Sequence, residues 1–182
     1  MLMSTPLCPR CPHARPPVLS TGPSPCRLLL IAESPTQDDD RYSEPCVGYN
    51  GRELNYVYLP MLGIPRSEIH IAHSILCSKV DYDYPTNEDA YTCASVHLGA
   101  LLARVRPQVI APMGAVACSL FPGIDLNMHH GIPREGAWGA VWRGVVWPMY
   151  SPGAGMKQTG YMIPLMRDFY ELGKLLKGMP ES

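Results

Sequence analysis

Four carboxylates follow an apolar run near the start of the chain: Glu33, Asp38, Asp39 and Asp40. The run, RLLLIA over 27–32, suits a strand that is buried on both faces. Carboxylates beyond the end of such a strand can activate a water molecule or stabilise a developing positive charge. Asp38 and Asp40 could equally belong to a solvated loop or cap a helix. Glu33 directly follows the strand, which makes it the stronger candidate for chemistry.

Four cysteines form a second group that could do chemistry: Cys8, Cys11, Cys77 and Cys93. The chain has 7 cysteines, an odd number for a disulfide framework, so metal ligands plus buried or reactive thiols are the better interpretation. Cys8 and Cys11 form a C-x2-C pair, Cys77 closes a predicted strand, and Cys93 lies inside the following predicted helix. Thiolates bind zinc and iron-sulfur clusters alike, so the spacing does not name the metal. Cys77 and Cys93 could also be ordinary core cysteines.

Composition restricts the class of protein without naming a partner. A chain of 182 residues predicts one domain, over 1–182, with a sizeable core. The net charge of -1 neither demands nor excludes a nucleic acid, which a local patch would have to hold. No segment approaches the roughly 20 apolar residues of a membrane span, and the N-terminus lacks a continuous apolar stretch. We therefore expect a cytoplasmic monomer with no membrane partner.

Strand and helix patterns alternate along the chain and must position these groups. Strands are predicted at 26–33, 68–76 and 108–112, helices at 50–64, 85–105, 114–121 and 162–176, and a hairpin or bent strand around Gly144 at 139–150. Residues 1–26 are rich in Pro, Cys and Arg without periodicity, which predicts an irregular segment anchored by a metal. The alternation predicts an α/β fold in three α/β/α layers, with a mainly parallel central sheet and the site beyond the carboxyl ends of its strands.

The cysteine motifs resemble those of a known family. C-x2-C-P near the start, a cysteine closing the second strand, and P-T-x-E-x4-C at 85–93 together resemble the [4Fe-4S] site of family 4 uracil-DNA glycosylases. The resemblance covers nearly the whole chain, from about residue 8 to about residue 176. It implies that Cys8, Cys11, Cys77 and Cys93 hold a [4Fe-4S] cluster, with zinc as the alternative, and that the cluster pins the N-terminal segment against the sheet.

The resemblance also implies an activity and its carboxylates. Enzymes of this kind flip a nucleotide out of DNA and hydrolyse its N-glycosidic bond through a cationic sugar. The family shows G-E-x-P-G at the first strand end, where this chain has Ala-Glu-Ser-Pro-Thr over 32–36. Glu33 takes the position of the catalytic Glu, and Asp39 aligns with another functional acid. We expect both to serve the water and the sugar cation, and Ser34 to line the base pocket.

Three pocket positions depart from the family pattern. Cys46 replaces the Phe of P-F-V-G, which removes a stacking face worth about 1–3 kcal/mol per base and leaves room beside the flipped base. His73 replaces the Asn that reads the base edge in T-N-x-x-K-C. Ser151 replaces the His of H-P-[SA], and its hydroxyl can assist the leaving base without carrying a charge.

Neighbouring residues could compensate for these changes or contact DNA. Tyr49 and Asn50 flank the pocket segment and could replace the missing ring or amide, although Asn50 suits a helix start equally well. Met156 and Lys157 lie where the family has its DNA-inserting loop. Met156 could wedge into the base stack and Lys157 could meet a phosphate, or Met156 could be a packing residue.

These observations predict a DNA glycosylase that removes a bulky, modified pyrimidine and leaves an abasic site. Glucosylated hydroxymethylcytosine, as found in phage DNA, fits an enlarged pocket, which would make the protein an anti-phage enzyme. One alternative is a catalytically silent relative that binds DNA or a partner protein. Another is uracil excision of the family type.

Overall fold

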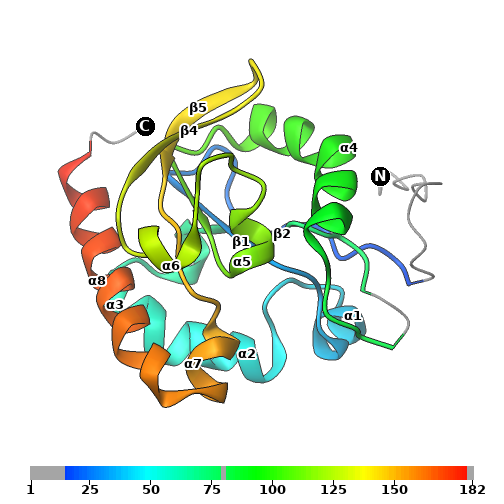
Figure 1. Cartoon of the computed structure of the whole chain (residues 1–182), viewed down its shortest axis with the longest axis horizontal. Coiled ribbons are helices and arrows are strands. Elements are labelled where there is room, and N and C mark those ends of the chain that lie inside the picture. Colours follow the sequence, from blue (N-terminus) through cyan, green and yellow to red (C-terminus); the bar gives the residue numbers. More distant parts are fainter. Residues whose placement is uncertain (1–14, 79–80, 180–182) are drawn as a thin grey trace.

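A five-stranded sheet forms the centre of the chain, whose computed structural model describes residues 15–78 and 81–179 (Figure 1). Its strands are β1 (Leu28–Ala32), β2 (His70–His73), β3 (Val109–Pro112), β4 (Arg134–Trp138) and β5 (Trp142–Val146). The strand order is β2-β1-β3-β5-β4. Every neighbouring pair is parallel except β4 and β5, which form an antiparallel hairpin. The predicted mainly parallel sheet is confirmed.

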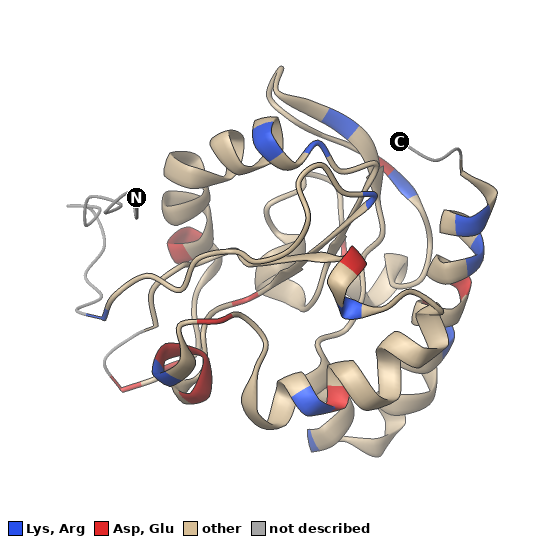
Figure 2. Cartoon of the chain, turned by 180° about the vertical axis from the view of Figure 1, so that it is seen from behind, with Lys and Arg blue, Asp and Glu red and all other residues tan. Residues whose placement is uncertain are grey.

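Helices of very different length connect the strands or follow the last of them. They are α1 (Gln37–Tyr42), α2 (Gly48–Glu53), the π-helical turn η1 (Leu54–Tyr58), α3 (Leu59–Leu62), the 3₁₀ turn η2 (Arg66–Glu68), α4 (Asn87–Val105), α5 (Ala115–Cys118), α6 (Leu126–His129), α7 (Pro152–Lys157), the 3₁₀ turn η3 (Thr159–Tyr161) and α8 (Met162–Gly178). Figure 2 shows acidic residues gathered on α1 and basic residues along α8. Within the described ranges, no helix is both long and apolar enough to cross a membrane.

The alternation of side chains along β1 explains the three layers. Leu29 and Ile31 point into a core that is shared with α4 and α5. Leu28 and Leu30 point into a second core, built with α3, α8 and the π-helical turn between α2 and α3. Because successive residues of a strand face opposite sides, a strand of uninterrupted apolar residues needs helices on both faces. The predicted α/β/α arrangement is confirmed.

Three segments differ from their predicted structure. The acidic run forms the short helix α1, because Thr36 and Asp39 make a reciprocal capping box. The expected inserting loop at 154–157 is helical and belongs to α7. The hairpin turns after Trp138, well before Gly144, which lies inside β5. Its first strand, β4, has exposed and half-buried residues that give no apolar alternation.

The N-terminal segment is held partly by backbone hydrogen bonds. Thr21 and Ile71 exchange two of them, at 3.0 and 2.8 Å, and the Val18 N–H donates to the Leu76 carbonyl at 2.8 Å. Residues 15–26 therefore follow the edge strand β2 and do not depend on a metal alone. Cys8 and Cys11 lie outside the described residues.

Close packing of α8 against α3 closes the second core. Gly173 of α8 lies so near the end of α3 that an added Cβ would stand 2.3 Å from the Leu62 carbonyl oxygen. A contact of that length with backbone cannot be relieved by rotating a side chain. Gly173 is thus required for the close approach of the two helices.

We expect Gly173→Ala to lower the free energy of unfolding by about 1–3 kcal/mol, because the clash with α3 outweighs the gain in helix propensity. Gly178→Ala is the matched control: it lies in the same helix and its added Cβ would meet nothing within 4 Å. Urea unfolding of both variants measures the difference. A Gly173→Ala protein as stable as Gly178→Ala would contradict this account of the α3–α8 packing.

Candidate active site

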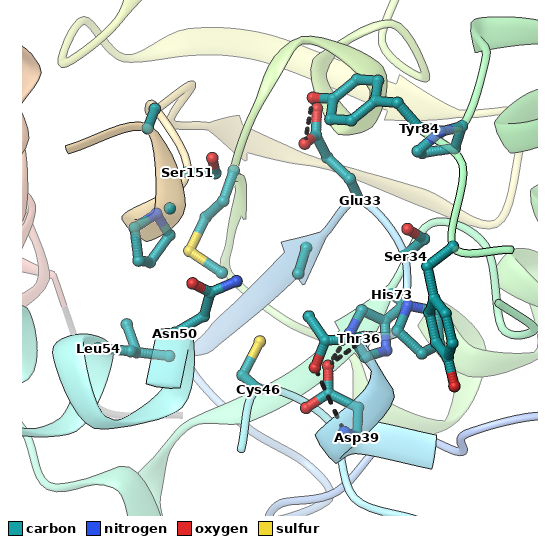
Figure 3. A pocket seen from close by; sticks show the side chains of 18 of the residues that line it. Glu33, Ser34, Thr36, Asp39, Cys46, Asn50, Leu54, His73, Tyr84 and Ser151 are labelled. Carbon is teal, nitrogen blue, oxygen red and sulfur yellow. Dashed lines mark hydrogen bonds and ion pairs between the residues drawn. The ribbon is translucent and has the colours of Figure 1, made fainter. Parts of the chain in front are cut away.

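A cavity of about 570 Å³ lies where β1, β2 and β3 end at their carboxyl sides (Figure 3). Glu33 and Ser34 line it directly after β1, His73 from the end of β2, and Met113 just after β3. Segments 46–54, 82–85 and 151–157 supply further wall residues. This is the edge at which open α/β sheets bind their ligands.

Glu33 is the carboxylate held most directly at the cavity. Its Oε1 accepts a hydrogen bond from the Val116 N–H at 3.0 Å, and its Oε2 accepts one from the Tyr84 hydroxyl at 2.5 Å. Burial raises the pKa of Glu33, although the Tyr84 hydroxyl, the Val116 N–H and the Lys157 charge each act to lower it. A carboxyl group with a raised pKa is a better proton acceptor than an exposed one.

Gly114 makes the position of Glu33 possible. An added Cβ on Gly114 would stand 2.4 Å from the Glu33 carboxyl carbon, and the φ of +99° disfavours any other residue. The Gly114 N–H donates to the Met149 carbonyl at 2.8 Å, which ties this turn to the segment leading to Ser151. The glycine therefore lets the Glu33 carboxyl group pass close to the backbone after β3.

Asp39 is more deeply buried than Glu33 and has different partners. Its Oδ2 accepts the Thr36 N–H at 2.8 Å and its Oδ1 accepts the Val47 N–H at 2.7 Å. Nε2 of His73 lies 3.6 Å from the same Oδ2. Burial alone would raise the pKa of Asp39, but the interactions with His73 and the two N–H groups outweigh it and lower the pKa. Asp39 is therefore a fixed negative charge beside the cavity.

Cys46 occupies a strained turn at the cavity wall. Its φ is +54°, in the left-handed region, and only 9% of the residue is exposed. Arg66 holds this turn by donating to the carbonyls of Pro45 and Cys46 at 2.6 and 3.1 Å. Burial raises the pKa of the Cys46 thiol to about 12, so the side chain is a small neutral wall.

Most of the other predicted pocket residues line the cavity, and Tyr49 does not. Asn50, Ser151, Met156 and Lys157 line the same cavity as Glu33 and His73. Figure 3 shows Asn50 beside Cys46, with Glu33 and Tyr84 at another end of the pocket. Tyr49 is not among the lining residues: it is 57% exposed, with the Arg52 guanidinium 5.6 Å from its ring centroid.

Two tyrosines that sequence reasoning missed also line the cavity. Tyr82 and Tyr84 lie in the connection from β2 to α4. The Tyr82 hydroxyl donates to Asp40 at 3.0 Å, and Arg15 packs 4.6 Å above the Tyr82 ring. The alternation Asp-Tyr-Asp-Tyr directly before Pro85 was the available signal, but a connection without periodicity does not indicate where its rings point.

Two of the four predicted metal ligands are described. Cys77 lies in the bend after β2, and Cys93 lies in the second turn of α4. Both are partly buried, and the Leu76 N–H donates to the Cys93 sulfur at 3.4 Å. A backbone donor to sulfur and a second nearby thiol fit the soft donor set of an iron-sulfur cluster or zinc. The described residues contain no group of three or more potential ligands.

Comparisons with known proteins find related sequences over most of this chain. A sequence profile of the uracil DNA glycosylase superfamily matches residues 19–169. A type-4 uracil-DNA glycosylase of Saccharolobus solfataricus is 24% identical over 164 residues, which cover 87% of this chain and 76% of the relative. A protein of the same name from Thermotoga maritima is 30% identical over 104 residues, or 57% of this chain and 53% of the relative.

The profile covers both carboxylates, the cavity segments and most of both helical layers. The family predicted from the motifs is thereby confirmed, with type-4 enzymes among its relatives. The chain belongs to the uracil DNA glycosylase superfamily, a family of DNA glycosylases.

Proposed function

We propose a substrate class and residue roles for this DNA glycosylase: it hydrolyses the N-glycosidic bond of a flipped-out pyrimidine larger than uracil, with Glu33 as the catalytic carboxylate. The observation that carries the proposal is the partly buried Glu33 carboxyl group, held by two hydrogen bonds at a cavity of about 570 Å³. Gly114 leaves the space that this carboxyl group occupies, since an added Cβ would stand 2.4 Å from its carbon.

The reaction breaks the bond between C1′ of the sugar and the base nitrogen, and the bonding electrons leave with the base. The oxygen of a water molecule bonds to C1′ and one proton of that water passes to Glu33. The departing base anion takes up a proton from solvent, and Glu33 returns its proton to solvent, so the carboxylate is regenerated. Glu33 orients the water and faces the cationic sugar. Asp39 adds a permanent negative charge, because its pKa is held low and both of its oxygens are occupied. The Ser151 hydroxyl donates to the leaving base.

The proposed base is enlarged, because small or polar groups stand where the family's pattern has a ring. Cys46 presents a small neutral wall, and His73, Ser34 and Asn50 offer polar atoms along the same cavity. Hydroxymethylcytosine and its glucosylated form carry hydroxyl groups that these side chains can hydrogen-bond. Phage genomes contain such bases, so a bacterial host would use this activity against phage DNA.

Contacts with DNA are assigned to α7. Met156 and Lys157 lie at the C-terminal end of this helix and at the rim of the cavity. An apolar side chain next to a cation suits the insertion of Met156 into the base stack and a phosphate contact by Lys157. The Lys157 charge also acts to lower the pKa of Glu33.

A [4Fe-4S] cluster is assigned to Cys77 and Cys93 together with Cys8 and Cys11, which lie outside the described residues. The hydrogen bond from Leu76 to the Cys93 sulfur supports this, since backbone donors to sulfur are typical of cluster ligands. When bound, the cluster would cross-link the N-terminal segment to β2 and α4. It would take no part in the hydrolysis.

Two other functions remain distinguishable from this one. The named relatives are uracil-DNA glycosylases, which makes uracil the second candidate base. A catalytically silent DNA-binding relative is the third reading. It would bind DNA without releasing a base.

The first test offers the protein 30-mer oligonucleotides, single-stranded and duplex, that contain cytosine, uracil, 5-hydroxymethylcytosine or glucosylated 5-hydroxymethylcytosine. We expect free base and alkali-labile abasic sites from the glucosylated substrate, measured by mass spectrometry and gel electrophoresis. Release of uracil alone would overturn the enlarged-base assignment. DNA binding without any abasic product would favour the silent relative.

The second test compares Glu33→Gln with Asp39→Asn. Glu33→Gln should lower kcat by roughly 10²- to 10⁴-fold, because the amide cannot take the proton of the attacking water. In the parent enzyme, kcat/KM should fall as the pH drops through the pKa of Glu33, which lies above the ordinary value of about 4.3 because the group is buried. Glu33→Gln should lack this acid limb.

Asp39→Asn should lose both the negative charge that faces the sugar cation and stability, the latter by about 1–3 kcal/mol at neutral pH, because an amide cannot accept both N–H groups. The folded-state pKa of Asp39 is lowered, so its contribution is present above the unfolded pKa of about 3.9 and disappears as the pH falls through the folded pKa. The two proteins should therefore converge in stability in acid. Equal activity of Glu33→Gln and its parent would contradict the role assigned to Glu33.

The third test concerns the cluster. Anaerobically prepared protein should contain iron and sulfide and absorb at about 400 nm, and Cys77→Ser and Cys93→Ser should each lose that absorbance. Cys118→Ala is the control, because Cys118 is buried against the Pro112 carbonyl and is not among the predicted ligands. Zinc in place of iron would contradict the cluster assignment.

A further inference from the structure

Tyr84 touches the catalytic carboxylate that the proposed function depends on. Its hydroxyl donates to Oε2 of Glu33, while Oε1 is taken by the Val116 N–H. These two donors lie in different connections of the sheet, one after β2 and one after β3. Together they occupy both carboxylate oxygens, so they determine the direction in which Glu33 faces the cavity (Figure 3).

The backbone on both sides of Tyr84 is anchored. Two residues earlier, the Tyr82 hydroxyl donates to Asp40 of α1. Two residues later, Thr86 caps α4, and its side chain and that of Asp89 make a reciprocal capping box. Pro85 between them is buried. A side chain held between two such anchors loses little conformational freedom when it binds a ligand.

The ring of Tyr84 remains open although its hydroxyl is bound. The residue is 65% exposed and lines the cavity. An aromatic face at the wall of a base pocket can stack on a nucleobase or pack on a sugar. Cys46 has no such face, and Figure 3 shows Tyr84 and Cys46 at different ends of the pocket. The aromatic contact that Cys46 cannot make is thus available from another wall.

We infer that Tyr84 has two roles in base excision: its hydroxyl positions Glu33, and its ring supplies the aromatic wall against which the flipped nucleotide packs. This inference rests on the proposed function and specifies how the same site works. A nucleotide that stacks on Tyr84 sits next to the carboxylate that the same side chain orients. Substrate binding and the alignment of Glu33 are therefore linked through one residue.

The two roles separate in two substitutions. Tyr84→Phe keeps the ring and removes the donor, so kcat should fall by roughly ten- to a hundredfold with little change in KM. Tyr84→Leu removes the ring as well as the donor. Its KM should therefore be about tenfold higher than that of Tyr84→Phe. The substrate is the glucosylated or uracil-containing 30-mer that the parent enzyme cleaves faster. Tyr91→Phe and Tyr91→Leu are matched controls, because Tyr91 on α4 is also 65% exposed and is not a cavity-lining residue.

The pH profile gives a readout that a merely structural tyrosine would not change. The groups that act on Glu33 are the Tyr84 hydroxyl, the Val116 N–H and Lys157, and the Cys118 thiol lies close enough to feel its charge. Tyr84→Phe removes the tyrosine hydroxyl, which is one of the groups that lower the pKa of Glu33. The acid limb of kcat/KM should therefore move to higher pH in Tyr84→Phe and stay in place in both Tyr91 variants.

Each outcome decides one question. Tyr84→Phe with the parent kcat and acid limb would overturn the positioning role. Tyr84→Leu with the KM of Tyr84→Phe would overturn the stacking role. Either result from an active parent enzyme leaves the proposed function intact, whereas a parent enzyme that releases no base from any oligonucleotide overturns both. Thermal melting of the variants should match the parent, because Tyr84 is largely exposed.

Discussion

The partial burial of one carboxyl group just after β1 sets the requirements for the rest of the site. Glu33 loses part of its hydration, and a carboxylate in that position must recover the loss through hydrogen bonds or nearby charge. Val116 and Tyr84 supply the hydrogen bonds, Lys157 supplies a charge, and Gly114 gives the space. These partners follow three different strands. The sheet brings them together because β1, β2, β3 and β5 run parallel and end at the same edge.

The two carboxylates at the cavity have environments that move their pKa values in opposite directions. Asp39 lies deeper, yet two backbone N–H groups and His73 lower its pKa, so it stays ionised. Glu33 has its pKa raised by burial and can exchange a proton nearer to neutral pH. Paired acids with divergent pKa values commonly divide the work of charge stabilisation and proton transfer. The same division is proposed here, with the capping box of α1 as the device that fixes Asp39.

Much of the fold could be predicted because its elements carry strong periodic signals. The uninterrupted apolar run of β1, the capped start of α4 and the amphipathic pattern of α8 all form the predicted elements. The strand β4 was not predicted, because its side chains are exposed or half-buried and show no apolar alternation. Its stability comes from pairing with β5. Helices α1 and α7 have six residues each and owe their form to a cap or to Pro at the first turn.

Site residues at strand ends could be predicted from the sequence, because the sheet fixes their positions. Site residues in the connections between strands and helices could not. Glu33 and His73 follow directly from strands, so their convergence on one cavity is a consequence of sheet order. Tyr84 comes from a stretch with no period, and its place depends on the anchors provided by Asp40 and the α4 cap. Such a connection can change its side chains without disturbing the sheet, because its own backbone is held at both ends. With the carboxylate fixed at a strand end and the proposed aromatic wall on a connection, the accepted base could change while the hydrolytic chemistry stays constant.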